Sequence, residues 1–410
     1  MKPVCVIRLD DWHGLAQAKV VMKALSAAGS ISLFVGGCVR NALLGEGVSE
    51  IDIATPETPE RVLTLLKQAG LRGVKTGIDH GTITAICGAR GFQITTLRKD
   101  IENFGRSARV EYTLNWNEDA ARRDLTLNAL YCDIKGNVFD PLDGLADLKA
   151  GRIRFVGNSK ARIKEDILRL LRYFRFYAYY GTEPADDKAL AACREFAPKL
   201  RKLSAERVWG ELSKLFLAQD PTPTLRMMKE NAILSYLLPE VVCCNSLKSM
   251  IQLEKRAGLK PDYLRRLAAI VDLCRDEASI LASRLKFSRV DRIRFCNLCD
   301  PKEQPDPQRG QKHNRAIIYR LGRNFFIELS ILSGAKFPDK DWLSLLELAE
   351  VTSLPSFPIK GSDVISSGIT EGARVGEIMK GIETWWIEGD FSADRQACLR
   401  YLDYFIGAGI

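Results

Sequence analysis

Residues 31–55 read ISLFVGGCVRNALLGEGVSEIDIAT and place a glycine pair between two apolar runs. The first run, ISLFV, is rich in β-branched and aromatic residues, which favour a strand. Gly36 and Gly37 then favour a tight turn, and the run after them has the spacing of a helix. A second strand is predicted at EIDIAT, residues 50–55. This order of strand, turn, helix and strand predicts a mixed α/β domain.

The same alternation continues up to about residue 155 and then stops. A helix is predicted over residues 58–70, and strands over TITAICGA (82–89) and FQITTLR (92–98). From about residue 159, apolar positions recur three and four apart, as in EDILRLLRYFRFYAYY (165–180) and SAERVWGELSKLFLA (204–218). Breaks are expected at 181–184, at 220–223 and at the linker-like stretch 301–315. The expected fold class is α+β: a mixed α/β head followed by an all-helical remainder.

Composition excludes several other classes of protein. The chain has 410 residues, 46% hydrophobic and 27% charged, as expected for a globular protein with more than one unit. Acidic residues interrupt the start of the chain, and no long apolar run follows, so we expect a cytoplasmic protein. Its eleven cysteines have no regular spacing, and with three histidines a histidine-based metal site is nearly excluded. Any catalytic metal must therefore bind carboxylates.

The positive charge is unevenly distributed. Residues 1–150 hold 18 basic and 18 acidic residues, so the net charge of +9 lies in residues 151–410. It is densest in residues 152–175 and 284–323. A polyanion such as RNA would fit both stretches, although solvated helix faces would also explain them.

The glycine pair and the acids after it suggest phosphate chemistry. Backbone amides at the start of the helix after Gly36-Gly37 could face a triphosphate, and Arg40 could add a cation, although a plain tight turn is the simpler interpretation. On a strand, Glu50 and Asp52 point to one face while the isoleucines between and after them face the core. Two Mg²⁺ ions would relieve the repulsion of the acids and support nucleotidyl transfer. The alternative is a polar strand end facing water.

A series of ordered sequence signatures points to a family. The sequence around Gly36 and Glu50, together with HGTITA, FQITTLR, GRSA, DAARRDLTLNALY, FDPLDGLADL and residues 164–172, closely resembles the bacterial tRNA nucleotidyltransferase and poly(A) polymerase family of the polymerase β superfamily. The resemblance implies a nucleotidyltransferase head (1–155), a nucleotide-selecting neck (156–220) and an RNA-binding body and tail (221–410). It also implies that Glu50 and Asp52 are the catalytic and metal-binding acids, with Mg²⁺ as cofactor.

The same resemblance assigns the nucleotide-binding residues. It places nucleotide phosphate at the glycine pair and Arg40, and the nucleotide and its ribose at the RRD motif, which would otherwise be a surface salt bridge. It implies base selection by an acid–arginine pair on one helix face. The complete set of expected nucleotide-binding residues is Gly36, Gly37, Arg40, Arg123, Asp124, Glu165, Asp166, Arg169, Arg172 and Arg175.

The base-selecting pair has a chemical basis. A carboxylate at Asp166 can accept from the exocyclic amine of cytosine or adenine, and Arg169 can donate to the neighbouring ring nitrogen. Uracil and guanine present the reverse pattern. Glu165 is expected to hold Arg169, and Arg172 and Arg175 are expected nearer the triphosphate. Without the family resemblance, an ordinary ladder of ion pairs along one helix would explain this spacing equally well.

The chain departs from the family pattern at three positions. Glu50 replaces the usual Asp, and Gln93 replaces a Glu, so a site with two carboxylates is expected. Asn41 replaces an Asp, for which we expect the loss of a local hydrogen bond or ion pair. The polar segment 99–113, which contains Gly105 and Arg106, is expected to be a mobile loop over the site, or else a plain surface connection.

The expected function is addition of CMP and AMP, from CTP and ATP, to the 3′ end of tRNA. A basic GRRF-type run that many bacterial poly(A) polymerases carry is absent before HGTITA. Poly(A) synthesis nevertheless remains the alternative, followed by a catalytically silent RNA-binding homologue. We expect tRNA, CTP and ATP as partners, and neither a membrane nor DNA.

Overall fold

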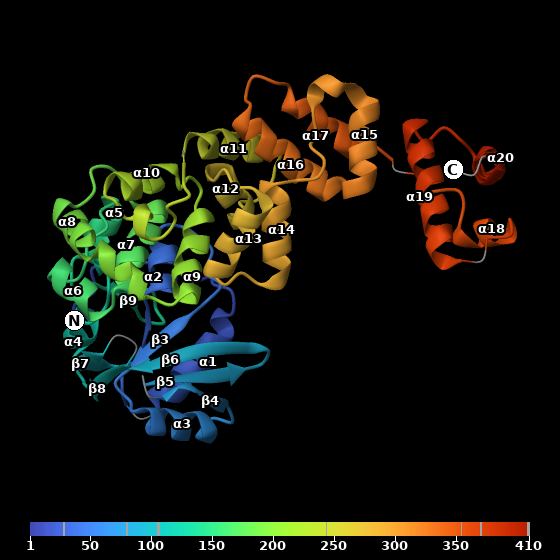
Figure 1. The fold of residues 1–410 in the computed structure, drawn as a ribbon. Helices are drawn as coiled ribbons and strands as arrows, with labels where there is room; N and C mark the ends of the chain where they lie inside the picture. Colours follow the sequence, from blue (N-terminus) through green and yellow to red (C-terminus); the bar gives the residue numbers. More distant parts are fainter. Residues whose placement is uncertain are drawn as a thin grey trace. The chain divides into compact units, whose positions relative to one another are not determined.

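The fold is described from a computed structural model that covers residues 1–27, 29–78, 81–104, 107–242, 244–353, 355–369 and 371–407, with backbone only at 100–104 and 107–110. The chain divides into two compact units, Met1–Pro239 and Glu240–Ile410 (Figure 1). The expected α+β class is confirmed, since the strands named below all precede residue 140. The finer division at residues 155 and 220 stays a prediction.

One mixed sheet forms the base of the first unit. In its described residues the sheet has eight strands in the order β1-β10-β9-β2-β3-β6-β5-β4, and only the β3–β6 pair is parallel. The strands are β1 (Cys5–Val6), β2 (Leu33–Val35), β3 (Asp52–Thr55), β4 (Arg72–Gly77), β5 (Thr82–Cys87), β6 (Arg90–Thr96), β9 (Tyr131–Cys132) and β10 (Asn137–Phe139).

Successive side chains of the central strands point to opposite faces of the sheet, and apolar side chains on both faces are buried. Leu33 and Val35 lie in one buried cluster with Ala120, close to the end of α4 (Trp116–Ala121). Phe34 points the other way and packs against Trp12. Helices α1 (Leu15–Ser26) and α3 (Pro59–Gln68) pack together with β5. The strands predicted at residues 31–35, 50–55, 82–89 and 92–98 are all present.

The segment expected to be a loop over the site is a hairpin instead. Strands β7 (Arg98–Phe104) and β8 (Ser107–Tyr112) pair antiparallel, with Arg98 opposite Tyr112. Backbone pairing in this ribbon satisfies polar groups that a loop would leave to water. Gly105 and Arg106 lie outside the described residues.

Short helices complete the first unit. They are α2 (Gly37–Leu43), α5 (Gly144–Lys149), α6 (Ser159–Glu165), α7 (Leu168–Tyr180), α8 (Asp187–Phe196), α9 (Ala205–Phe216) and α10 (Thr222–Glu230), with 3₁₀ turns η2 (Thr126–Asn128), η3 (Ala197–Lys202) and η4 (Leu234–Tyr236). Figure 1 shows α7 beside α9 and α10.

The expected single helix from residue 165 to 180 is wrong. Asp166 has an extended backbone, with φ −147° and ψ 111°, and separates α6 from α7. Its carboxylate accepts a hydrogen bond from the Leu168 amide at 3.1 Å. This contact offers the backbone an alternative to the helical ladder, which is why the helix ends at Glu165 and restarts at Leu168.

All regular elements in the described residues of the second unit are helices, apart from a single β-bridge between Val241 and Val271. Its helices are α11 (Asn245–Arg256), α12 (Tyr263–Ile270), α13 (Arg275–Arg284), α14 (Arg289–Cys299), α15 (Gly310–Leu321), α16 (Arg323–Lys336), α17 (Trp342–Val351), α18 (Gly361–Ser366), α19 (Gly372–Glu388) and α20 (Arg395–Gly407), with the turn η5 (Pro307–Arg309). Among the described residues, no helix is long and apolar enough to cross a membrane.

The linker expected at residues 301–315 is only partly present, because α15 already begins at Gly310. The fully buried side chain of Asn314 explains why residues 310–315 form the start of a helix and not a linker. Its side-chain amide donates to the carbonyl oxygens of Asp306 and Gly310, at 2.8 Å each, and its oxygen accepts from the Asp306 amide at 3.1 Å.

An ion pair joins the sheet domain to helix α7. Asp124 follows α4 and is 8% exposed, and its carboxylate accepts from Arg172 Nε at 2.6 Å. It also accepts from Asn128 Nδ2 at 3.1 Å and from the Leu125 amide at 2.9 Å. Burial opposes ionisation of Asp124, but the Arg172 charge outweighs it and lowers the pKa of Asp124 to about 2.

This pair generates a prediction about stability. A carboxyl group whose pKa falls from 3.8 to about 2 on folding contributes about 2 kcal/mol at neutral pH, and this contribution is lost as the pH falls from 4 through 2. Asp124→Asn should therefore lower the free energy of unfolding of the first unit by about 2 kcal/mol at pH 7. The deficit should shrink as the pH approaches 2.

Urea unfolding followed by circular dichroism at neutral and acidic pH measures this effect. Asp11→Asn removes an exposed carboxylate of the same unit and is the matched control. Equal stability of Asp124→Asn and the unaltered chain at pH 7 would contradict the assignment of Asp124 as the link to α7.

Candidate active site

The glycine turn connects β2 to α2 as the sequence predicts. Gly36 has φ +75°, which non-glycine residues rarely adopt. A Cβ atom there would also lie 3.7 Å from Arg123 Nη1 and from the Asn128 carbonyl oxygen. Gly37 is the first residue of α2, so its backbone lies at the helix N-terminus. The turn therefore brings the glycine pair next to the RRD motif.

Arg40 is held between the sheet domain and α7. It is 8% exposed, and it donates to Asn128 Oδ1 at 2.6 Å and to Asn41 Oδ1 at 2.9 Å. Its guanidinium lies over the rings of Phe176 and Tyr180, 5.1 and 4.7 Å from their centroids. Burial lowers the pKa of Arg40. Its buried Nε atom has no hydrogen-bond partner in the described structure.

Of the two losses considered at Asn41, that of a local hydrogen bond does not occur. The amide oxygen of Asn41 accepts from Arg40, and Tyr180 OH lies 3.5 Å from the same atom. An amide oxygen can accept these bonds without a charge. Replacement of the usual Asp therefore removes the ion pair and keeps the hydrogen bond.

The acid pair stands at the start of β3. Ile51 and Ile53 are buried at 5% and 0% exposure, as the alternation predicts, whereas Glu50 and Asp52 are exposed. Glu50 itself precedes the strand, which begins at Asp52. Partial desolvation and the neighbouring charge of Glu50 raise the pKa of Asp52, and Arg123 opposes this shift. Such repulsion is what a bound cation would remove.

Gln93 occupies the position beside the acid pair. It is paired with Asp52 in the parallel β3–β6 register, so both residues lie on the same face of the sheet. An amide oxygen at this position can still coordinate a divalent cation but carries no charge. The described residues contain no cluster of three or more His, Cys, Asp or Glu suited to a metal. Two carboxylates and an amide oxygen fit a hard cation whose remaining ligands come from phosphate and water.

A buried carboxylate that sequence reasoning missed organises the RRD motif. Asp119 is 1% exposed and accepts from Arg122 Nη2 at 2.6 Å, from Arg123 Nη2 at 3.0 Å and from Tyr131 OH at 2.7 Å. Burial alone would raise its pKa, but the charges of Arg123 and Arg122 lower the pKa of Asp119 to about 2. The spacing of three and four residues in DAARR contains this signal. The motif is therefore a buried network and not a surface salt bridge.

The acid and the arginine of the base-selecting pair are each held by a neighbour. Arg169 Nη1 forms an ion pair with Glu165, as expected, and Arg169 Nη2 donates to the Arg122 carbonyl oxygen at 3.2 Å. Asp166 accepts from Arg207 Nη2 of α9 at 2.7 Å. Because Asp166 precedes α7, the pair does not share one helix face. It lies on a single turn, with the Arg169 amide donating to the Asp166 carbonyl oxygen at 3.0 Å.

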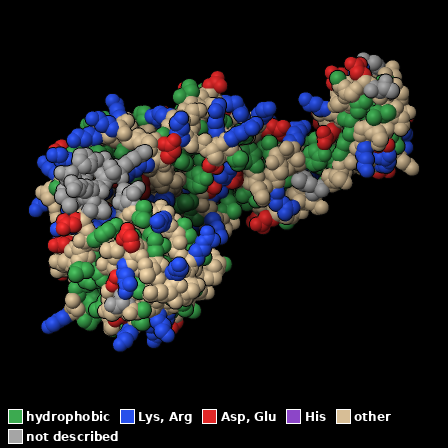
Figure 2. Space-filling model, turned by 90° about the horizontal axis from the view of Figure 1, so that it is seen from below, with side chains coloured by type: hydrophobic (Ala, Val, Ile, Leu, Met, Phe, Trp, Pro, Cys, Tyr) green, Lys and Arg blue, Asp and Glu red, His purple; other side chains and the backbone are tan. Residues whose placement is uncertain are grey.

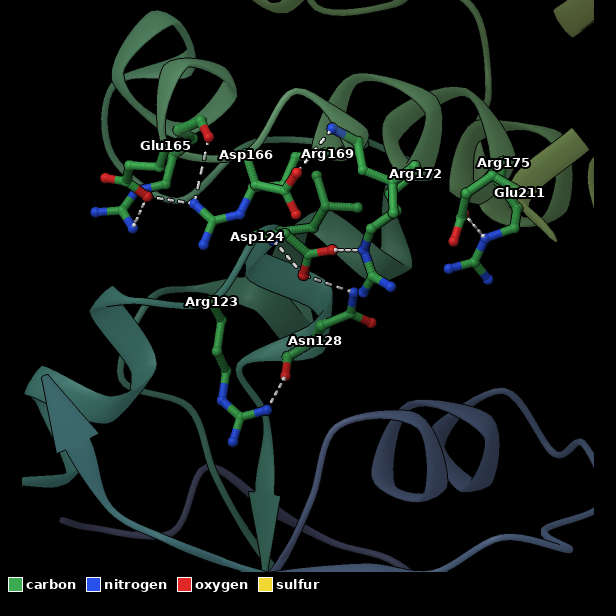
Figure 3. A network of polar contacts seen from close by, with 12 residues as sticks. Arg123, Asp124, Asn128, Glu165, Asp166, Arg169, Arg172, Arg175 and Glu211 are labelled. Carbon is green, nitrogen blue, oxygen red and sulfur yellow. Dashed lines mark hydrogen bonds and ion pairs between the residues drawn. The ribbon is translucent and has the colours of Figure 1, made fainter. Parts of the chain in front are cut away.

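Three guanidinium groups surround one aromatic ring. Arg40, Arg172 and Arg175 lie 5.1, 5.5 and 4.2 Å from the centroid of Phe176. Arg175 also donates to Glu211 of α9 at 2.6 Å. Figure 3 shows the resulting chain of contacts from Arg123 through Asn128, Asp124 and Arg172, with the Arg175–Glu211 pair beside it.

The structure brings most of the sequence-predicted residues close to one another, and it adds residues that hold them in place. Asn128 was quoted only as part of a motif, yet it contacts Arg40, Arg123 and Asp124. Phe176 looked like an ordinary core residue of an amphipathic helix. Nothing in its local pattern distinguishes an aromatic ring that packs on arginines from one that packs on leucines.

Family comparisons agree with this arrangement. The model of the poly(A) polymerase head domain matches residues 32–154. The model described as "Probable RNA and SrmB-binding site of polymerase A" matches residues 186–244.

Comparison with solved structures shows the same fold. The CCA-adding enzyme of Bacillus stearothermophilus in complex with CTP has a TM-score of 0.72 at 21% identity, over 96% of this chain and 98% of that one. The CCA-adding enzyme of Thermotoga maritima complexed with tRNA has a TM-score of 0.68 at 19% identity, over 98% and 100%.

Relatives in sequence extend over most of the chain. The mitochondrial CCA tRNA nucleotidyltransferase 1 of Danio rerio is 33% identical over 378 residues, covering 90% of this chain and 86% of its own length. The CCA-adding enzyme of Lactococcus lactis subsp. cremoris is 35% identical over 392 residues, covering 93% and 94%. With the glycine turn, the acid pair and the RRD network in place, the chain belongs to the family of CCA tRNA nucleotidyltransferases, the CCA-adding enzymes.

Proposed function

We propose that this protein adds CMP and AMP, from CTP and ATP, to the 3′ end of tRNA without a nucleic-acid template. The observation that carries the proposal is the fixed Asp166–Arg169 turn, which is linked through Asp124 and Asn128 to Arg123 near the acid pair. The proposed base-selecting turn therefore lies at the start of the helix that this network fixes, and the charge of Arg123, at the other end of the network, acts on Asp52 of the proposed metal site. Family membership supports the same reaction.

The acid pair would hold the divalent metal that nucleotidyl transfer requires. We propose Mg²⁺, held by Glu50 and Asp52 with the amide oxygen of Gln93 nearby. When bound, it would supply charge neutralisation at the phosphates and activation of the RNA 3′-hydroxyl. The raised pKa of Asp52 fits a site whose negative charge is excessive until a cation binds.

Base selection would use hydrogen-bonding positions on the side chains of Asp166 and Arg169 beyond those already bonded to protein groups. The carboxylate of Asp166 can accept more bonds than those from Leu168 and Arg207, because two oxygens offer about four lone-pair positions. It can therefore accept from the amino group of cytosine or adenine, while Arg169 donates to the ring nitrogen. UTP and GTP would leave a buried donor or acceptor unpaired, which is costly.

The triphosphate would bind at the arginines around Phe176 and the glycine turn. Arg172 and Arg175 form ion pairs with Asp124 and Glu211, whereas the described residues show no ion pair of Arg40, whose guanidinium donates to the amide oxygens of Asn128 and Asn41. Of these three cations, Arg40 is therefore the one without a carboxylate in direct contact. A guanidinium held in this way matches phosphate oxygens geometrically.

We propose that the neck and the helices after it bind the tRNA backbone. Residues 151–239 contain 17 basic and 10 acidic residues, so the excess positive charge follows the head directly. Figure 2 shows Lys and Arg side chains spread over the face in view. The head (1–155), neck (156–220) and body with tail (221–410) are the corresponding proposed domains, and the cytoplasmic location is part of the same proposal.

Poly(A) synthesis is the second candidate, because the head-domain family that matches residues 32–154 is named for it. Product length separates the two reactions. The protein is incubated with Mg²⁺ and a tRNA that ends at the discriminator base, with CTP alone, ATP alone or both. Two additions with CTP and a third only with ATP are expected. A long ladder with ATP alone would identify a poly(A) polymerase, and no extension despite tRNA binding would identify a silent homologue.

Removal of one metal-binding acid should abolish the chemistry and spare RNA binding. In Asp52→Ala we expect the rate of nucleotide transfer to fall by at least about a thousandfold, since a cation contributes several kcal/mol to the transition state. Binding of tRNA, measured by gel shift, should change little. Asp11→Ala is the matched surface control. Transfer at the normal rate by Asp52→Ala would refute the metal-ligand assignment.

Loss of the selecting arginine should relax nucleotide choice. In Arg169→Ala we expect the preference for CTP and ATP over UTP and GTP, as a ratio of kcat/KM values, to fall about 10- to 100-fold. Arg226→Ala, an exposed arginine on α10, serves as the control. Unchanged rejection of UTP and GTP by Arg169→Ala would count against the template.

A further inference from the structure

A cavity in the second unit plays no part in the site described above. It has a volume of about 480 Å³ and lies where η5 and the start of α15 meet the end of α16 and the start of α17. Helices α15, α16 and α17 are labelled beside one another in Figure 1. Pockets for small ligands commonly enclose 300 to 1,000 Å³, roughly, so the volume suits a ligand of nucleotide size.

The walls of the cavity are held by specific bonds. Asn314, fully buried on α15, clamps the segment before it through both hydrogen bonds with the Asp306 backbone. The Asp306 carboxylate in turn accepts from Lys340 Nζ, 3.1 Å away, on the segment that leads into α17. Trp342 Nε1 donates to the Phe337 carbonyl oxygen at 2.7 Å. The three segments around the cavity are therefore tied to one another.

Both apolar and basic side chains line the cavity. Pro305, Ile317 and Trp342 line it and are buried. The ring of Phe337 also lines the cavity and is 58% exposed, so one face is open to a stacking partner. The charged lining residues are Lys302, Arg309, His313, Arg320 and Lys340, with Glu303 and Asp306.

Two of these cations form no ion pair within the described residues, and one of them, Arg309, acts at longer range on the Asp306 carboxylate, whose pKa it helps to lower. Arg320 is paired with Glu303 at 3.2 Å, and Lys340 with Asp306. Lys302 and Arg309 form no ion pair within the part of the chain that the structure describes. The four Lys and Arg residues and the two carboxylates of the lining therefore carry a net charge of +2. Two cations without an ion pair beside an aromatic ring are the combination that recognises a phosphate joined to an aromatic base.

We infer that this cavity binds one nucleotide, with its phosphate at Lys302 and Arg309 and its base against Phe337. The nucleotide belongs either to an RNA strand or to a free mononucleotide, since both present the same phosphate and base. The inference does not depend on the proposed reaction, because it uses no residue of the acid pair, the glycine turn or the base-selecting turn.

The three histidines of the chain provide a direct probe. They are His13, His80 and His313, so protein labelled with ¹⁵N at histidine gives few ring signals, and His313→Gln identifies the one at the cavity. The full-length protein is titrated, without metal, with ATP, with a short oligouridylate and with inorganic phosphate. We expect a saturable shift of the His313 signal with ATP or with the oligouridylate. Whichever probe binds more tightly identifies the source of the nucleotide.

Two variants separate the contributions of phosphate and base. In the double variant Lys302→Ala/Arg309→Ala, affinity for the bound probe should fall by at least about tenfold, because both charge-assisted bonds are lost. Lys312→Ala/Arg289→Ala removes the same charge from exposed positions that do not line the cavity, and should retain the affinity. Phe337→Ser should weaken ATP or oligouridylate binding while leaving any binding of inorganic phosphate unchanged.

The outcomes that would overturn the inference are equally specific. One is the absence of a saturable His313 shift with all three probes at millimolar concentration. A second is a shift with inorganic phosphate alone, which would refute the assignment of a nucleotide. A third is unchanged affinity in Lys302→Ala/Arg309→Ala, which would place the bound phosphate elsewhere.

Discussion

The arrangement of this site depends on the buried carboxylate of Asp124. A charge at 8% exposure is costly unless it is paired, and Asp124 meets that requirement through Arg172 on α7 and Asn128 in the head. The side-chain oxygen of Asn128 accepts a hydrogen bond from Arg40, and its backbone carbonyl oxygen accepts one from Arg123. One carboxylate therefore fixes α7 with respect to the glycine turn and to the arginine nearest the acid pair. Loss of the charge on Asp124 would remove the ion pair with Arg172, and the start of α7 would then depend more on the bond from Arg169 to the Arg122 carbonyl oxygen.

Nucleotide choice without a template requires that the selecting groups keep their orientation when no base is bound. The break between α6 and α7 supplies part of this rigidity, because Asp166 starts α7 through its own carboxylate and cannot rotate without losing that bond. Arg207 holds its second oxygen, and Glu165 with the Arg122 carbonyl holds Arg169. Bonds that exist before the substrate arrives need no reorganisation when it binds, which is the physical basis of discrimination by a fixed site.

Sequence reasoning succeeded where local periodicity carries the information and failed where partners are distant. Alternation placed the isoleucines around Asp52 in the core, and the glycine pair placed the turn, because each depends only on neighbouring residues. The helix break at Asp166 was missed because apolar spacing continues through it, while the cause is a side chain bonding to the backbone. Residues 310–315 looked like a linker because their composition is polar. Their helix depends on the buried Asn314, whose contacts extend back to Asp306.

The arginines around Phe176 show why structure is needed to separate packing from binding. A guanidinium on an aromatic ring gains stability even near other cations, since the ring face carries partial negative charge. Phe176 thus lets Arg40, Arg172 and Arg175 share a small volume in which two carboxylates, Asp124 and Glu211, form the described ion pairs. Burial and the repulsion of Arg175 both lower the pKa of Arg40. An anion with several charges, such as a triphosphate, would reduce the repulsion among these arginines, so relief of that repulsion would contribute to its binding at the proposed site.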